Sequence, residues 1–223
     1  GTVYDAAGTE VVSPAAGGSY LAKADVTLGG KITEANFESA VLTISKNDAA
    51  AVTTSFTTFD GSAGDWIYKQ PASAEHTDDG KYAYTVTLTD KAGFTTAYAV
   101  TVLVDTTAPE LTVTSPAANE SVEQNTKEFK GTITDSGCGY KNITYTLTNS
   151  SGEKTEKTFT PAGESWNSGS VSLGTKQGTL TLELYAADKL DNKTETKSIT
   201  FYYDDAYPVI SETTVGVSGK VTN

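Results

Sequence analysis

The chain has 223 residues, 37% of them hydrophobic, and a formal net charge of −12. Its 16 basic residues are all lysines and face 28 acidic residues, so no basic stripe can neutralise phosphates and a nucleic-acid partner is not expected. A single cysteine rules out an intrachain disulfide, and no apolar run is long enough to span a bilayer, so direct membrane insertion is not expected.

Alternating apolar and polar residues run through the first half of the chain, a pattern typical of strands with one buried face. The strands expected there lie near Val11–Val12, Asp25–Thr33, Ala40–Lys46, Val52–Thr57, Asp65–Tyr68, Tyr82–Leu88 and Tyr98–Val104. The last two flank a polar turn, which predicts a hairpin. Trp66 is matched by Trp166 in the second half, and both are predicted to pack in a core rather than to stack on a sugar.

The second half shows the same alternation and the same spacing of turn residues. The strands expected there lie near Leu111–Thr114, Lys127–Thr134, Lys141–Thr148, Lys154–Phe159, Ser170–Leu173, Leu180–Ala186 and Lys197–Tyr203. About seven short strands in each half, with no helical period, predict an all-β fold built from β-sandwiches.

Short motifs of the first half recur in the same order in the second, at spacings of about 100 residues. "SPAAGGS" from Ser13 returns as "SPAANES" from Ser115, "GKITE" from Gly30 as "GTITD" from Gly131, and "VDTTAPE" from Val104 as "YDDAYPV" from Tyr203. A repeat of this length is a whole domain. We therefore expect domains at residues 1–105 and 106–204, followed at 205–223 by the opening strand of a truncated third repeat or a linker.

These motifs also resemble a known family. G-x-I-T-D/E, A-G-x-x-W, D-G-x-Y-x-h-x-V (h, apolar), D-K-A-G and the closing V-D-T-T-A-P resemble the tandem bacterial immunoglobulin-like domains, of the Big type, in large cell-surface adhesins and cell-wall-associated proteins. The resemblance covers both halves and implies two tandem immunoglobulin-like Greek-key β-sandwiches. Leu180 stands in the second half where the first has Tyr82, so a tyrosine-corner hydrogen bond is expected in the first half alone.

The resemblance implies an extracellular, non-catalytic structural module. It would be a stalk or spacer of a bacterial surface or secreted multidomain protein, with neighbouring immunoglobulin-like domains as partners. The alternative is an adhesin-type binding module for a host glycoprotein, an immunoglobulin or a glycan. No enzyme is expected, because His76 is the only histidine and lies in a polar turn, and one histidine with one cysteine is too few ligands for a zinc site.

No cofactor is expected, although calcium is considered for the junctions between domains. Calcium takes oxygen ligands, and the resemblance implies calcium between such repeats. The candidate ligands near the first junction are Asp90 and Asp105, with Glu34 or Asp135 in nearby loops. Their counterparts near the second junction are Asp188, Asp204 and Asp205. We favour the alternative that these aspartates shape turns by accepting hydrogen bonds from nearby backbone N–H groups.

The stretch "YKQPASAEHTDDG" is the most distinctive insert of the first half. If the chain binds a host protein or glycan, the predicted binding loop comprises Tyr68, Lys69, Gln70, His76, Asp78 and Asp79. In "VDTTAPE", Pro109 fixes its own φ and pushes Ala108 towards extended geometry, which predicts a short, stiff connection between the domains.

Overall fold

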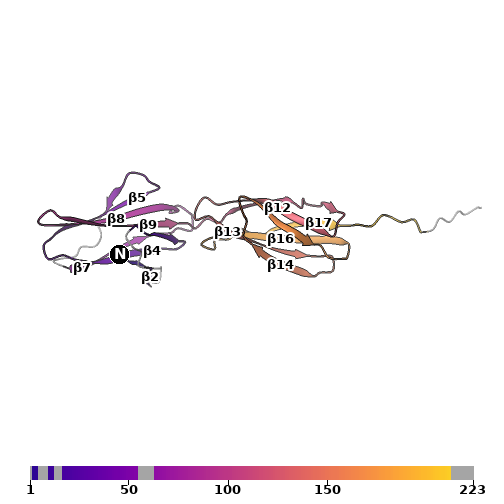
Figure 1. The fold of residues 1–223 in the computed structure, drawn as a ribbon, viewed down its shortest axis with the longest axis horizontal. Coiled ribbons are helices and arrows are strands. Elements are labelled where there is room, and N and C mark those ends of the chain that lie inside the picture. Colours follow the sequence, from indigo (N-terminus) through magenta and orange to yellow (C-terminus); the bar gives the residue numbers. More distant parts are fainter. Residues whose placement is uncertain (1, 5–9, 13–16, 55–62, 212–223) are drawn as a thin grey trace, which may run out of the picture.

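The computed structural model describes residues 2–4, 10–12, 17–54 and 63–211 (Figure 1). These residues form strands, turns and loops. The described residues contain no helix, and so none that could cross a membrane. The all-β class predicted from the alternation is therefore confirmed.

Two groups of strands follow one another along the chain. The first comprises β1 (Thr2–Tyr4), β2 (Glu10–Val12), β3 (Ser19–Ala22), β4 (Val26–Thr33), β5 (Phe37–Lys46), β6 (Val52–Thr54), β7 (Ala63–Gln70), β8 (Gly80–Asp90) and β9 (Thr95–Val104). The second comprises β10 (Glu110–Ser115), β11 (Ser121–Val122), β12 (Thr126–Thr134), β13 (Tyr140–Thr148), β14 (Lys154–Phe159), β15 (Ser165–Ser172), β16 (Gly178–Asp188) and β17 (Lys197–Tyr203). No described strand of one group pairs with a strand of the other.

The second group forms a sandwich of two sheets. One has the strand order β10-β12-β15 and the other β11-β17-β16-β13-β14. Neighbouring strands are antiparallel except β11 and β17, which run parallel. Because consecutive strands such as β12 and β13 lie in different sheets, the connectivity is that of a Greek key.

The first group repeats this arrangement, with sheets ordered β2-β1-β4-β7 and β3-β9-β8-β5-β6. Strand β3 runs parallel to β9, as β11 does to β17. The groups differ at one edge, where β1 lies against β4 and β2 pairs with β1, whereas β10 lies directly against β12. The predicted fold class of two tandem Greek-key sandwiches is thus the observed one.

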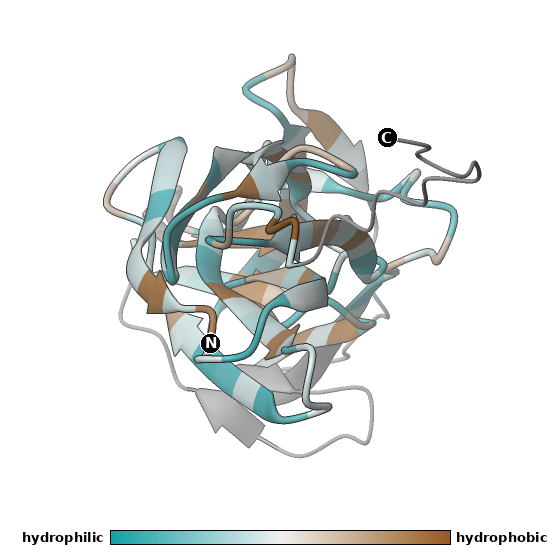
Figure 2. Ribbon diagram, turned by 90° about the vertical axis from the view of Figure 1, so that its right-hand side faces the viewer, coloured by the Kyte–Doolittle hydropathy of each residue, from teal (hydrophilic) through white to brown (hydrophobic). Residues whose placement is uncertain are grey.

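Apolar side chains fill the space between the sheets of each sandwich, and Figure 2 shows hydrophobic and hydrophilic bands alternating along the strands. In the second sandwich the ring of Phe129 lies edge-on to Tyr145 and Phe201, at centroid distances of 5.3 and 6.3 Å. Trp166 is buried in this core, as predicted, while the side chain of Trp66 lies outside the described part of the chain. These large rings contribute much of the apolar area that stabilises the sandwich.

The first sandwich has a smaller core and a polar bond at its centre. Its fully buried side chains include Leu28, Leu42 and Tyr84, and the Tyr84 hydroxyl donates a hydrogen bond to the buried Gln70 amide oxygen. The Tyr82 hydroxyl donates to a backbone carbonyl four residues earlier, that of Asp78, at 2.8 Å. This is the tyrosine corner predicted for the first half.

Several elements differ from the sequence-based expectation. Strands β3 and β11 were not predicted, because they have four and two residues and are too short for an alternation to stand out. Strand β15 begins at Ser165 rather than Ser170, and the expected strand at 52–57 is described only to Thr54. Residues 205–211 of the expected third-repeat strand form no strand, since no described strand lies beside them, and 212–223 lie outside the described residues.

Candidate functional site at the connector between the sandwiches

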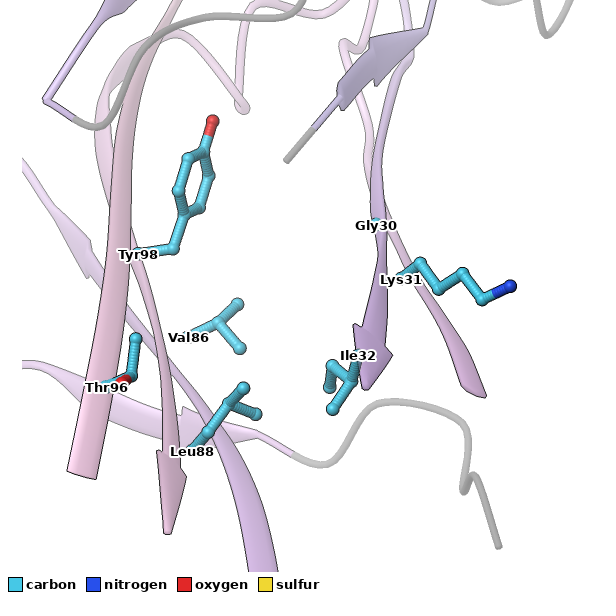
Figure 3. Close-up of a pocket in the computed structure, with 7 residues that line it drawn as sticks. All are labelled: Gly30, Lys31, Ile32, Val86, Leu88, Thr96 and Tyr98. Carbon is cyan, nitrogen blue, oxygen red and sulfur yellow. The ribbon is translucent and has the colours of Figure 1, made fainter. Parts of the chain in front are cut away.

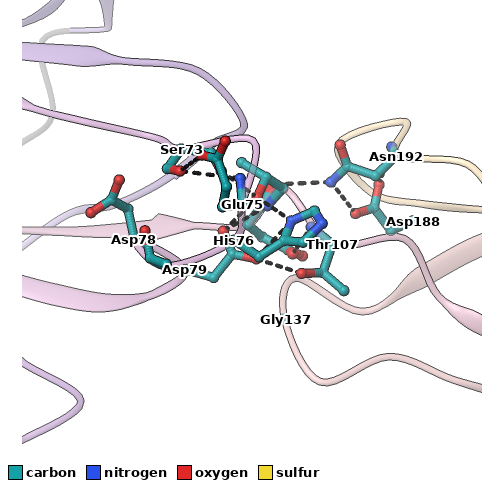
Figure 4. A network of polar contacts seen from close by, with 12 residues as sticks. Ser73, Glu75, His76, Asp78, Asp79, Thr107, Gly137, Asp188 and Asn192 are labelled. Carbon is teal, nitrogen blue, oxygen red and sulfur yellow. Dashed lines mark hydrogen bonds and ion pairs between the residues drawn. The ribbon is translucent and has the colours of Figure 1, made fainter.

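Residues 105–109, here called the connector, join β9 to β10 (Figure 4). The Asp105 N–H donates to the Ala22 carbonyl at 2.8 Å, which continues the pairing of β9 with β3 by one residue. Asp105 is only 1% exposed, and its Oδ1 accepts the Thr107 N–H at 3.1 Å. This side-chain turn is the local chemistry that the sequence predicted for the aspartate.

The first sandwich holds the connector through Asp79, which ends the β7–β8 loop (residues 71–79). Asp79 Oδ1 accepts both the N–H and the hydroxyl of Thr106, at 3.0 and 2.8 Å, and Oδ2 accepts the Thr107 hydroxyl at 2.6 Å. Partial burial raises the pKa of the Asp79 carboxyl, but the hydrogen bonds from Thr107 and Thr106 outweigh it and leave this pKa below its ordinary value. The ionised form of Asp79 therefore stabilises the connector.

His76 adds a further contact on the same side. Its Nδ1 lies 2.7 Å from the Thr106 hydroxyl oxygen, and the Ser73 carbonyl oxygen lies 3.2 Å from the same hydroxyl, as a second and longer acceptor beside Asp79. His76 adopts a φ of 62°, a left-handed conformation that is uncommon for a residue with a side chain. The sole histidine of the chain is thus part of the support for the connector.

The second sandwich holds the connector from the opposite side. The Cys138 N–H donates to Asp105 Oδ2 at 2.6 Å, and the Asn192 side-chain amide donates to the Asp105 carbonyl at 2.9 Å. A Cβ at Gly137 would lie 2.1 Å from Asp105 Oδ2, so this approach requires glycine. Both carboxylate oxygens and the carbonyl of Asp105 are therefore occupied.

Two aspartates shape the loops that make these contacts. Asp135 Oδ1 accepts the N–H groups of Gly137 and Gly139, at 2.9 and 2.8 Å, and so orders the β12–β13 loop (residues 135–139). Asp188 Oδ1 accepts the N–H groups of Leu190 and Asn192, at 2.9 and 2.7 Å, and its Oδ2 accepts the Asn192 amide at 2.7 Å. Because the Asn192 amide bonds both Asp188 and the connector, Asp188 positions the group that reaches across the junction.

The predicted calcium ligands are only partly brought together. Asp105 and Asp135 each place an oxygen within 4.8 Å of the Cys138 sulfur and of one another, and Asp188 lies beside them through Asn192. No ion pair between described residues involves these three carboxylates. Burial, followed by hydrogen bonding to Asp105 and Asp188, raises the pKa of the Cys138 thiol to about 12, which keeps the thiol neutral at physiological pH.

Asp90 and Asp188 do not lie at the junctions to which the sequence assigned them, so the expected groupings were wrong. Gly80 pairs with Val104 and so lies beside the connector, which places Asp90 at the opposite end of β8. Ten residues separate Gly80 from Asp90, a distance of about 33 Å along a strand. The same hairpin geometry in the second sandwich places Asp188 at the first junction and leaves Asp204 at the far end of β17. Antiparallel strand direction accounts for both corrections.

The predicted binding loop is largely engaged in internal contacts. Gln70 is 2% exposed and bonds Tyr84, the Tyr68 ring lies 5.7 Å from the Tyr84 ring, and Lys69 pairs with Asp25 at 2.6 Å. His76 and Asp79 bond the connector, while Asp78 accepts the tyrosine-corner bond through its carbonyl. The structure places these six residues in the first sandwich and its junction, rather than on one free surface.

A cavity of about 120 Å³ opens between the sheets of the first sandwich (Figure 3). It is lined by Gly30, Lys31, Ile32, Val86, Leu88, Thr96 and Tyr98. Figure 3 shows Ile32, Val86 and Leu88 turned towards this space and the Lys31 side chain turned away from it. The described side chains turned towards it are apolar ones from the interior of the sandwich.

Comparisons with known proteins identify no family. No family model matches the sequence, and no curated protein matches it. Among solved structures, the chain is similar to fibronectin(III)-like modules of Clostridium thermocellum CbhA, with 16% identity, a TM-score of 0.36, and coverage of 90% of this chain and 93% of that one. A 1.5-MDa bacterial ice-binding adhesin gives 20% identity, a TM-score of 0.39 and coverage of 83% and 60%.

A Ca²⁺-stabilized adhesin that helps an Antarctic bacterium to bind ice is also similar, with 21% identity, a TM-score of 0.28 and coverage of 91% and 57%. TM-scores this low carry no argument about function.

Proposed function

We propose that this chain is a non-catalytic structural module, a two-domain stretch of a stalk or spacer in a bacterial surface or secreted multidomain protein. The observation that carries the proposal is the connector, whose Asp105 accepts hydrogen bonds from the second sandwich while Thr106 and Thr107 bond the first. A junction held from both sides transmits orientation from one sandwich to the next. The motif resemblance supports the bacterial, extracellular setting.

The proposed mechanism is mechanical. Strands β8 and β16 have 11 residues each, so a sandwich extends about 36 Å along its strands at 3.3 Å per residue. Stacking such units end to end projects a neighbouring domain away from a surface. In this proposal the partners are the neighbouring immunoglobulin-like domains of the same chain, and residues 1–105 and 106–204 are separate domains.

The alternative function, adhesin-type recognition of a host glycoprotein, immunoglobulin or glycan, has less support. The loop predicted to bind is the β7–β8 loop with the end of β7, and its side chains bond the core and the connector. A binding tip would instead require a loop that is free of such internal contacts. The stalk therefore accounts for more of the observed bonds.

Small-angle scattering of the full chain tests the stalk directly, with Asn192→Ala as the perturbing variant. We expect one extended particle for the native chain, and a shorter mean dimension with a broader distance distribution for the variant, because the cross-junction bond to Asp105 is lost. Asn149→Ala is the matched control, since Asn149 orders a different hairpin by accepting the Ser151 and Glu153 N–H groups. A compact native particle would refute the stalk, identical profiles for all three proteins would show that the Asn192 bond does not fix the junction, and specific retention on a glycan array would favour the alternative.

A further inference from the structure

The two sandwiches end in the same aspartate turn. Asp204 Oδ1 accepts the Ala206 N–H at 3.1 Å, as Asp105 Oδ1 accepts the Thr107 N–H at 3.1 Å. The Asp204 N–H donates to Val122, as that of Asp105 does to Ala22. Asp204 therefore has the backbone geometry of the aspartate that bonds across the first junction.

The two turns differ in what the second carboxylate oxygen meets. Oδ2 of Asp105 accepts the Cys138 N–H, whereas Asp204 is exposed and its Oδ2 accepts no hydrogen bond from the described part of the chain. The adjacent Asp205 is already engaged, because it accepts hydrogen bonds from Tyr203 and Gln177. Among the described residues, Asp204 Oδ2 thus remains as an acceptor held in place by its turn, beside a hollow lined by Ser121, Glu123, Asp204, Asp205, Ala206 and Tyr207.

The occupied junction defines what such an acceptor requires from its partner. The β12–β13 loop supplies a residue without a Cβ, Gly137, and the backbone N–H of the next residue, Cys138. The β16–β17 hairpin supplies the Asn192 amide for the aspartate carbonyl. These three features form a recognisable receptor for an aspartate turn.

We propose that the end of the second sandwich is a docking face for another sandwich domain with this receptor, and that Asp204 bonds it as Asp105 bonds the second sandwich here. The proposal rests on the proposed stalk function and specifies its partner. The partner has a loop glycine followed by a free N–H, and an asparagine at the tip of its last hairpin. Continuity with the first junction, through the same turn, is the argument for this occupant.

A second copy of this chain does not fit that description. In its first sandwich the loop between β4 and β5 comprises residues 34–36 and is two residues shorter than the β12–β13 loop. The position of Gly137, two residues after the acidic residue that begins the loop, is held there by Asn36. Asn36 and Gly137 each donate their N–H to that acidic side chain. The hairpin position of Asn192 is held in the first sandwich by Phe94, which is 76% exposed. The two positions correspond because the Phe94 N–H bonds Asp90 as the Asn192 N–H bonds Asp188, in each case four residues earlier.

An extended chain tests the proposal, with residues 1–208 kept and residues 110–204 repeated after Pro208. This places the receptor behind Asp204 at a high effective concentration. We expect the repeated Cys138 amide to exchange with solvent roughly tenfold more slowly than in the same chain with Asp204→Ala. Glu123→Ala, on the same face but outside the proposed bond, is the control and should leave exchange unchanged.

A second chain keeps the test decisive even if the repeated sandwich fails to fold. In the unextended protein, replacing residues 34–36 by the sequence of residues 135–139, together with Phe94→Asn, builds the receptor on the first sandwich. We expect this chain to self-associate in sedimentation velocity, the unaltered chain to stay monomeric, and Asp204→Ala to abolish the association. The proposal is overturned if Asp204→Ala changes neither the exchange of the repeated Cys138 amide nor the self-association. It is also overturned if the extended chain folds but leaves that amide unprotected, or if the grafted chain stays monomeric. Independent motion of the two sandwiches in the native chain would instead refute the stalk itself.

Discussion

The two sandwiches close with the same turn, yet their ends are held differently. After Asp105, Thr106 and Thr107 give three hydrogen bonds to Asp79, whereas after Asp204 the next residue, Asp205, is bonded by Tyr203 and Gln177. The first end also meets a second sandwich. An aspartate turn is therefore set by local sequence, while a rigid junction needs partners from both neighbouring domains.

The strongest way to break the occupied junction is Gly137→Ala. A Cβ there would lie 2.1 Å from Asp105 Oδ2, so the loop must move and the Cys138 N–H must leave the carboxylate. We expect a loss of about 1–3 kcal/mol in the free energy of unfolding, measured in urea.

Gly163→Ala is the matched control, because nothing lies within 4 Å of the Cβ that it adds. It should change the free energy of unfolding by less than about 0.5 kcal/mol. If Gly137→Ala were as mild as this control, the close approach at the junction would not contribute to stability.

Asp79→Asn removes the ionised acceptor that distinguishes the first end. We expect the free energy of unfolding to fall by about 1 kcal/mol at neutral pH. Asp78→Asn is the control, because in the described part of the chain Asp78 accepts a hydrogen bond through its backbone carbonyl and not through its carboxylate. The pKa of Asp79 is lowered in the folded chain, so its contribution is present above its unfolded pKa, near 4, and is lost as the pH falls through the folded value. Urea unfolding of both variants at pH 7 and pH 3 measures this, and an Asp79→Asn deficit that persists unchanged at pH 3 would contradict it.

Tyr82→Phe removes a hydrogen bond that belongs to the first sandwich alone, since the second has Leu180 at this position. Loss of the bond to the Asp78 carbonyl should lower the free energy of unfolding by about 0.5–1.5 kcal/mol. Tyr202→Phe, at an exposed tyrosine of the other sandwich, serves as the control. Equal effects of the two substitutions would mean that the tyrosine corner adds no stability.

The smallest expected effect is that of calcium removal. Both Asp105 oxygens already accept backbone N–H groups, so we expect EDTA to shift the Tm by less than about 2 °C. A larger fall in a thermal scan, reversed by calcium but not by magnesium, would instead assign a calcium ion to the cluster of Asp105, Asp135 and Asp188.

Much of the fold could be predicted from the sequence, because alternation and the internal repeat report directly on which face of a strand is buried. The tyrosine corner followed from the same logic, since Tyr82 lies at the start of a strand in a motif that the second half changes to Leu180. The site was harder to predict. Gln70 was assigned to a binding loop, but it is buried in the first sandwich, where it accepts a hydrogen bond from Tyr84, 14 residues later in the sequence.

The junction residues Gly137 and Asn192 were missed because each acts on a residue distant in sequence. The signal was present in the two places where the halves differ: the longer β12–β13 loop, and an asparagine where the first half has Phe94. Asp90 and Asp188 were assigned to the wrong junctions because a sequence offset does not show which end of a hairpin points forward.

¹⁵N relaxation of the full chain measures whether the connector is rigid. If hydrogen bonds from both sandwiches fix residues 105–109, amides of the two sandwiches should fit one anisotropic rotational diffusion tensor with its long axis along the molecule. Relaxation that requires two separate correlation times, each that of a single sandwich tumbling independently, would contradict the account.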